Sequence, residues 1–286
     1  MVPPLDPDFR PAVLANRAFR QASGQKTVPV RIALERMYGC VSRFDTAVAD
    51  QDSPVAPGNF FYLERLLKFL LWSRGGWKIY FSGPAELGRR LQAHYTDTKR
   101  GRFDARMMGR RIYEKAFQVA LVSPEDMPAA REPTIALGRH LAGCRIGFDL
   151  GASDRKVAAV IDGRTVFSDE TAWDPRSHSD PQWHFAQIMD SLQRAAAHLP
   201  RVDAIGGSSA GVYVNNRVRV SSLFRGVPED LFDQRVNTLF LEMRKAWNDV
   251  PLEVVNDGEV TALAGSMSIQ DNAVLGIALG SSQAAG

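Results

Sequence analysis

Two aspartates in this 286-residue chain stand where chemistry could be done, each at the end of a short apolar stretch. Asp149 is followed by the small residues Gly151, Ala152 and Ser153. Backbone N–H groups of such a turn can approach phosphate oxygens closely, and a carboxylate can hold a Mg²⁺-bound water, because hard cations prefer oxygen ligands. The turn therefore predicts a phosphate and magnesium site. An ordinary structural β-turn is the alternative that the same residue types allow.

The second aspartate, Asp257, follows the apolar run 252–255 and precedes a predicted helix that starts at Glu259. Open α/β sheets bind ligands at the carboxyl ends of their strands. Asp257 could act there as a general base towards a hydroxyl group, and Asn256 could hydrogen-bond the same substrate. The alternative is a helix N-cap, a role that Asn and Asp fill at many helix starts.

A third segment combines a strand pattern at 273–278 with a loop of small and hydroxylated residues. Gly280, Ser281 and Ser282 in this loop could wrap a nucleotide phosphate. The segment predicts a second phosphate loop.

Alternating strands, hairpins and helices must position these groups. Asp162-Gly163 and Asn215-Asn216 are favoured hairpin turns, and apolar spacing predicts helices over 183–198 and 229–248. Hairpins come first and strand–helix alternation follows, so we expect an α/β fold with a mixed sheet and helices on its faces.

The first half of the chain has a different pattern. We expect an arm over about 1–25, a strand beginning at 25–34, a helix ending at Gly75-Gly76, a further helix over 102–116 and a buried strand at 117–122. Pro124, Pro128 and Pro133 mark a linker over 123–141. The chain is therefore divided into an amino-terminal α/β domain, 1–142, and a second domain, 143–286.

Together, four segments in this order resemble the landmarks of the ROK sugar kinases, which belong to the actin-like ATPase superfamily. They are the turn 149–153 for the family's Asp-Ile-Gly-Gly-Thr, the strand and loop 205–212 before its substrate hairpin, 256–263 for its Asn-Asp-Ala-Asn base segment, and 280–282 for its Gly-Thr-Gly phosphate loop.

The resemblance implies a ribonuclease H-like, actin/sugar-kinase nucleotide-binding lobe over about 143–286 and a glucokinase-like, ATP-dependent phosphorylation of a sugar hydroxyl. ATP and Mg²⁺ would be cofactors, with Asp257 as the general base. Substrate contacts would come from Asn256, Gly207, Ser208 and Glu259. Nucleotide phosphates and Mg²⁺ would be held by Asp149, Gly151, Ala152, Ser153, Lys156, Gly280, Ser281 and Ser282, with Arg155 as a further charge partner.

Departures from the family pattern support an alternative. Leu223 stands where the family has a sugar-binding Asn, and Ala152 stands at a family glycine. A non-catalytic, ROK-like protein that binds sugar or nucleotide, or that regulates, is the second hypothesis. By the same comparison the family's second lobe and its His/Cys zinc segment would lie beyond Gly286, so we expect a fragment of a longer protein.

Other enzyme classes fit less well. Residues 207–211 match the Gly-x-Ser-x-Gly nucleophile elbow around Ser209, but a hairpin pattern follows and no histidine occurs after His198. The chain has no HExxH motif and no Walker A motif.

A basic stripe is formed by Arg102, Arg106 and Arg110, which share one face of their predicted helix. Such a stripe could meet phosphate or nucleic acid, but no aromatic residues alternate with it, so we interpret it as a solvated helix face. Nucleic acid is not expected as a partner. A helix-turn-helix is not expected either, because Gly75-Gly76 interrupts the pattern at 60–95.

Composition sets the remaining bounds. Residues 1–142 carry 22 Lys and Arg against 14 Asp and Glu, a net charge of +8, whereas residues 143–286 carry −5. No apolar run approaches the ~18 residues of a membrane helix, so we expect a cytoplasmic protein. Two cysteines, Cys40 and Cys144, with no CxxC spacing argue against a disulfide framework or a zinc site. A homodimer is compatible with the sequence.

Overall fold

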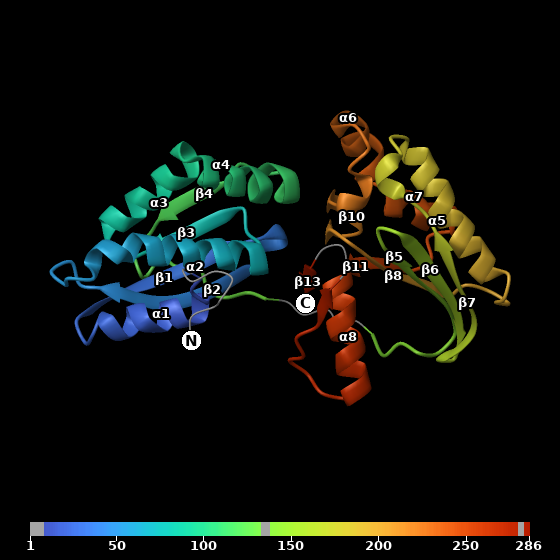
Figure 1. The fold of residues 1–286 in the computed structure, drawn as a ribbon, viewed down its shortest axis with the longest axis horizontal. Helices are drawn as coiled ribbons and strands as arrows, with labels where there is room; N and C mark the ends of the chain where they lie inside the picture. The colour runs from blue at the N-terminus through green and yellow to red at the C-terminus, as the bar shows by residue number, and fades with distance from the viewer. Residues whose placement is uncertain (1–8, 133–137, 280–282) are drawn as a thin grey trace. The chain divides into compact units, whose positions relative to one another are not determined.

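The computed structural model describes residues 9–132, 138–279 and 283–286, and the chain forms two compact units, Met1–Thr134 and Ile135–Gly286. Each unit contains helices and a sheet with both parallel and antiparallel neighbours (Figure 1). The predicted α/β fold class is therefore confirmed. No helix in the described ranges has both the length and the apolar character needed to cross a bilayer.

The first unit is built on a four-stranded sheet in the order β2-β1-β3-β4. Strand β1 pairs antiparallel with β2 and β3, and β3 pairs parallel with β4. The strands are β1 (Thr27–Glu35), β2 (Val41–Ala49), β3 (Lys78–Ser82) and β4 (Gln118–Leu121). The helices are α1 (Ala12–Ala22), α2 (Asn59–Arg74), α3 (Ala85–Asp97), α4 (Lys99–Ala105) and the π-helical turn η3 (Arg106–Tyr113).

Leucines at helical spacing explain α2, because all five lie on its buried side: Leu63, Leu66, Leu67, Leu70 and Leu71. The helix ends as predicted at Gly75, whose φ is +77°. A Cβ at Gly75 would lie 2.1 Å from the Tyr113 hydroxyl oxygen, so this stop also needs glycine for space.

Several expectations for the first unit are wrong. Residues 12–22 form helix α1 rather than an arm, and Phe19 of α1 stacks on Tyr62 with ring centroids 4.7 Å apart. The helix expected over 102–116 begins at Lys99 and widens into η3 from Arg106. Strand β4 is partly exposed rather than buried, because it is an edge strand with β3 as its one neighbour.

The second unit contains a five-stranded sheet in the order β11-β8-β5-β6-β7. Strands β5, β8 and β11 run parallel, while β6 and β7 continue from β5 as an antiparallel meander. The strands of the sheet are β5 (Cys144–Leu150), β6 (Asp154–Ile161), β7 (Arg164–Ala172), β8 (Ala204–Ser209) and β11 (Leu252–Asn256). Two hairpins add β9 (Val212–Val214), β10 (Arg217–Val220), β12 (Ile277–Leu279) and β13 (Gln283–Ala285).

The helices of this unit are α5 (Pro181–Ala196), α6 (Glu229–Leu231), the π-helical turn η6 (Phe232–Val236), α7 (Leu239–Ala246) and α8 (Asp257–Ile269). Short 3-10 turns complete the chain at η1 (Met37–Gly39), η2 (Ala56–Gly58), η4 (Pro175–Ser177) and η5 (Ser222–Phe224). The helix expected over 229–248 is thus divided into three pieces. The strand expected at 273–278 lies instead at β12.

Both predicted hairpin turns are confirmed. Asp162 and Gly163 have φ values of 48° and 80°, and Asn215 and Asn216 have φ values of 52° and 59°. Positive φ at both central residues is the geometry of a type I′ turn, whose twist matches that of the paired strands.

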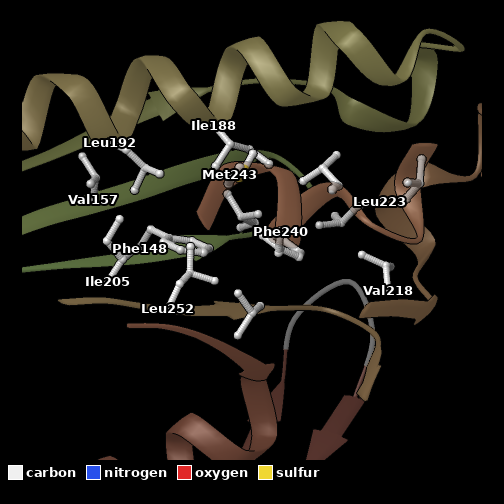
Figure 2. Packing of buried hydrophobic residues seen from close by; sticks show 14 of the residues in the cluster. Phe148, Val157, Ile188, Leu192, Ile205, Val218, Leu223, Phe240, Met243 and Leu252 are labelled. Carbon is white, nitrogen blue, oxygen red and sulfur yellow. The ribbon is translucent and has the colours of Figure 1, made fainter. Parts of the chain in front are cut away.

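The core of the second unit lies between one face of this sheet and the helices α5 and α7 (Figure 2). Phe148, Ile205 and Leu252 point from three neighbouring strands towards Ile188 and Leu192 of α5 and Phe240 and Met243 of α7. Strand side chains alternate between faces, so residues 147 and 149 point to the other face, beside which α8 lies.

We expect Leu192→Ala to lower the free energy of unfolding by about 2–5 kcal/mol, because it leaves a cavity in a close-packed core. The measurement is denaturant unfolding of purified protein. Val166→Ala, at an exposed position of β7 in the same unit, should change it by about 0.5 kcal/mol or less. Equal losses in the two variants would contradict this description of the core.

Candidate active site

The carboxyl ends of β5, β8 and β11 meet at one edge of the sheet, because the three strands are parallel neighbours. Asp149 of β5 is paired in register with Ser208 of β8, and Ser208 with Val255 of β11. Since β8 lies between β5 and β11, the outer two are two strand spacings apart, about 10 Å. Asp149 and Asp257 therefore belong to the same edge of the sheet, on either side of β8.

Asp149 lies between a serine that bonds to it on one neighbouring strand and a lysine on the other. The Ser208 hydroxyl donates a hydrogen bond to Asp149 Oδ1, and Lys156 is the register partner of Asp149 on β6. Lys156 donates to Asp154, which raises the pKa of the lysine, and the Asp149 carboxylate acts in the same direction. The structure thus gathers three of the predicted residues, Asp149, Lys156 and Ser208.

The predicted phosphate turn is closed by its own backbone. The Gly151 N–H donates to the Asp154 carbonyl at 2.9 Å, and the Gly151 carbonyl accepts from Trp173 Nε1 at 2.9 Å. The Ser153 hydroxyl donates to Asp154 at 2.8 Å, and Ala152 packs against the core. These contacts confirm the structural-turn interpretation for Gly151, whose N–H already has an acceptor.

Asn256 and Asp257 begin helix α8. Asn256 Oδ1 accepts from the Gly258 N–H at 2.9 Å, which confirms the N-cap interpretation, and its Nδ2 donates to the Gly211 carbonyl at 2.8 Å. One N–H and one lone pair of this amide remain for a ligand. Asp257 is the first residue of α8, where the helix dipole favours a negative charge.

Asp257 Oδ1 is buried and has no hydrogen-bond partner, and within the described ranges it is the one carboxylate oxygen in this state. Leaving a buried acceptor unpaired costs about 1–3 kcal/mol, so such a group in a native fold calls for an explanation. A substrate hydroxyl that donates to this oxygen would supply one.

A hydroxyl network beside Asp257 was missed by the sequence analysis. The Tyr213 hydroxyl donates to Ser209 Oγ at 2.7 Å, and Ser221 Oγ donates to the Ala210 carbonyl at 2.6 Å. Burial raises the pKa of Tyr213 to about 12, and the Asp257 carboxylate contributes in the same direction. The loop 205–212 was the one signal in the sequence, because Ser221 reaches the Ala210 carbonyl only through the hairpin of β9 and β10.

Two other residues predicted to contact substrate, Gly207 and Glu259, do not belong to this network of hydrogen bonds. A Cβ on Gly207 would lie 2.0 Å from the Phe148 ring, so Gly207 faces the core and its role there is packing. Glu259 is exposed on the first turn of α8. Gly280, Ser281 and Ser282 lie outside the described residues.

Arg155 corrects one expectation, and Leu223 is the departure from the family pattern that the sequence already showed. Arg155 was expected as a phosphate partner, but its buried guanidinium bonds to α5 through Gln187, Asp190 and Ser191. Leu223, at the position of the family's sugar-binding Asn, is 0% exposed and packs in the core.

Asp149 suits a Mg²⁺ ion bound through water. Its Oδ1 accepts from Ser208, and its second oxygen remains available for a metal-bound water. In the described part of the chain no three His, Cys, Asp or Glu side chains cluster as a metal site. Mg²⁺ in phosphoryl-transfer sites commonly uses one or two carboxylates together with substrate phosphates, so a single aspartate fits this ion.

A cavity of about 1210 Å³ lies on the open face of the sheet. Asp149, Lys156 and Ser208 line it together with Gly206 and with Leu263 of α8. The polar row at the carboxyl end of the strands therefore opens into a space of ligand size.

No protein-family model matches the chain, and no curated protein matches it. Solved structures that it resembles include a putative N-acetylmannosamine kinase from Listeria monocytogenes, at 18% identity over 43% of this chain and 38% of that chain, with a TM-score of 0.33. A glucokinase from Parabacteroides distasonis matches at 14% identity over 45% of this chain and 35% of that one, with a TM-score of 0.37.

A ROK family transcriptional regulator, a homologue of the E. coli MLC protein, matches at 20% identity over 51% of this chain and 36% of that one, with a TM-score of 0.36. The chain thus spans less than two fifths of the length of each of these three proteins. The predicted resemblance to the ROK family is found over about half of the chain, and it is a likeness of fold.

We expect Gly207→Ala to lower the free energy of unfolding by about 1–3 kcal/mol, because the added methyl group would overlap the Phe148 ring. The matched control is Gly206→Ala, whose methyl group would meet no atom within 4 Å. Denaturant unfolding of both variants is the measurement. A Gly207→Ala protein as stable as the control would contradict the packing role.

Proposed function

We propose that residues 143–286 form the nucleotide- and sugar-binding lobe of an ATP-dependent sugar kinase, similar to ROK glucokinases, with Asp257 as the general base. The observation that carries this proposal is the buried, unpartnered Asp257 Oδ1 at the strand edge that also holds Asp149. A carboxylate acceptor without a protein donor is suited to receive the hydroxyl proton of a substrate.

The residues divide the work of phosphoryl transfer, which depends mainly on positioning and charge neutralisation. The substrate hydroxyl oxygen attacks the γ-phosphorus of ATP, the bond from that phosphorus to the bridging oxygen of ADP breaks, and the hydroxyl proton passes to Asp257. Asp257 is the first residue of α8, where the helix dipole favours a negative charge. Asn256, with one N–H and one lone pair free, orients the same hydroxyl.

The opposite side of β8 serves the nucleotide. Ser208 fixes the carboxylate of Asp149, which would hold Mg²⁺ through water, and the ion when bound neutralises phosphate charge. Lys156 adds a positive charge beside Asp149. Ala152 and Ser153 are the phosphate contacts of the first turn in this proposal, since the Gly151 N–H is engaged, and residues 280–282 would supply the second loop.

The second candidate is a non-catalytic, ROK-like protein that binds sugar or nucleotide, or that regulates. Its specific support is Leu223, an apolar side chain that is fully buried at the position where the kinase family has a hydroxyl-binding amide. The engaged Gly151 N–H also favours weaker phosphate binding.

We expect Asp257→Asn to lower the rate of sugar-dependent ADP release by roughly 10²–10⁴-fold, because the amide cannot accept the hydroxyl proton. Nucleotide affinity, measured by calorimetry, should stay within about threefold of wild type, since Asp257 lies across β8 from the phosphate side. Asp271→Asn, an exposed carboxylate near the end of α8, is the matched control and should keep full activity.

The same assay separates the two candidates. ADP release over a panel of hexoses that depends on Asp257 supports the kinase. Nucleotide or sugar binding without ADP release, equal in wild type and Asp257→Asn, supports the non-catalytic protein. An active Asp257→Asn variant within twofold of wild type removes the aspartate from the role of base.

A further inference from the structure

The first unit carries a surface that the proposed kinase does not use. It is formed by Phe69 and Trp72 of α2 together with Phe103 of α4 and the arginines that flank it, and we call it the aromatic–basic face. The two helices are joined here because Trp72 Nε1 donates to Asp104 of α4 at 2.9 Å.

Large aromatic rings on this face are open to solvent. Phe69 is 66% exposed, Phe103 is 47% exposed and Trp72 is 44% exposed. Phe103 and Trp72 lie nearly parallel, with an interplanar angle of 11° and centroids 6.1 Å apart. A centroid distance that long between parallel rings means that they are offset, so each ring keeps much of a flat face available for stacking.

An ion pair with a buried carboxylate fixes the Trp72 ring. Asp104 is buried and accepts from Lys68 through both carboxylate oxygens, at 2.6 and 2.8 Å, in addition to Trp72. Lys68 in turn lies over the Trp72 ring, 5.5 Å from its centroid. The platform is therefore pre-organised, which reduces the entropy lost when a partner binds.

Exposed cations surround the platform. Between residues 99 and 110 the chain has five basic residues and one acidic residue, Asp104, whose charge Lys68 already balances. All five basic side chains are exposed, and none of them forms an ion pair with any described residue: Lys99, Arg100, Arg102, Arg106 and Arg110. Arg102 and Arg106 flank Phe103 in the sequence, and Arg106 lies one helical turn beyond it.

This charge disfavours a second copy of the chain as the partner. A two-fold contact through the aromatic–basic face would bring the same unpaired arginines together. Like charges that face each other across an interface cost several kcal/mol of binding free energy. The partner must instead be negative and must present flat rings. Arginine forks match phosphate oxygens, and nucleobases stack on aromatic side chains whatever their sequence.

We propose that the aromatic–basic face binds single-stranded nucleic acid, with bases stacking on Phe103 and Trp72 and with Arg102 and Arg106 contacting phosphates. Phe103 is the one aromatic residue within the stripe of arginines, and α2 adds the Trp72 ring in the folded unit. This inference does not depend on the proposed kinase activity.

The test is the fluorescence anisotropy of labelled dT20 and rU20 oligonucleotides titrated with the full chain at 50 and 200 mM KCl. Wild type should bind both, more weakly at the higher salt concentration, because phosphate contacts release counterions. Arg102→Gln/Arg106→Gln should weaken binding at 50 mM KCl by about tenfold and flatten the salt dependence. Phe103→Ala should weaken it by at least about fivefold, the loss expected for one stacked base.

Matched controls separate this face from general effects. Arg17→Gln/Arg20→Gln removes two exposed charges from α1, and Phe44→Ala removes an exposed ring from β2, so both should bind within twofold of wild type. Circular dichroism confirms that every variant folds.

Three results would overturn the proposal. One is no anisotropy change up to 50 µM protein. A second is equal loss of affinity in the face variants and their controls. The third is Phe103-dependent flotation with vesicles containing phosphatidylserine, or Phe103-dependent dimerisation in sedimentation, without oligonucleotide binding.

Discussion

Backbone pairing of β8 with a parallel strand on each side decides which groups of the second unit can act together. Parallel register places Asp149, Ser208 and Val255 in one row, and it ends β5, β8 and β11 at one edge. The turn after β5 and the start of α8 are consequently neighbours of the same strand, although more than 100 residues separate them in the chain. A one-residue slip of β5 would turn Asp149 into the core and bring Phe148 out of it. The burial of Phe148 in the apolar core under α5 and α7 therefore keeps Asp149 on the face of the sheet that carries the site.

In this arrangement of strands, some polar groups already have a hydrogen-bond partner in the protein and others do not. The two terminal nitrogens of Arg155 and the Gly151 N–H have protein partners, whereas Asp257 Oδ1 is buried without one. Groups of the first kind hold helices and turns in place. The open carboxylate oxygen is where a ligand can add a bond that folding did not make.

The first unit shows the same division on its surface. The buried carboxylate of Asp104 pairs with Lys68, and the aromatic rings beside it remain exposed among arginines that form no ion pair with any residue the structure describes. A balanced charge at the buried carboxylate is compatible with an excess of positive charge on the surface. Solvent screens the exposed guanidinium groups, but it cannot screen a buried carboxylate. The positive balance of residues 1–142 is therefore concentrated where it can meet a partner.

Local chemistry made much of the fold predictable from the amino-acid sequence alone. Helix α2 follows from leucine spacing and a glycine stop, the two type I′ hairpins from Asp-Gly and Asn-Asn, and the N-cap at Asn256 from its place before a helix. These features depend on neighbouring residues in the chain, so composition and spacing suffice to predict them. The resemblance to ROK kinases added the roles expected for the two aspartates.

Only the tertiary structure decided which side chains meet. Gly207 was a candidate for substrate contact in the sequence, but packing against Phe148 assigns it to the core. Ser221 reaches the Ala210 carbonyl through a hairpin, and Trp72 meets Phe103 across two helices. The sequence determined the turns, the helix stops and the carboxylates that end strands. Contacts between distant segments depend on register and on the burial of whole faces, and no local pattern carries that information.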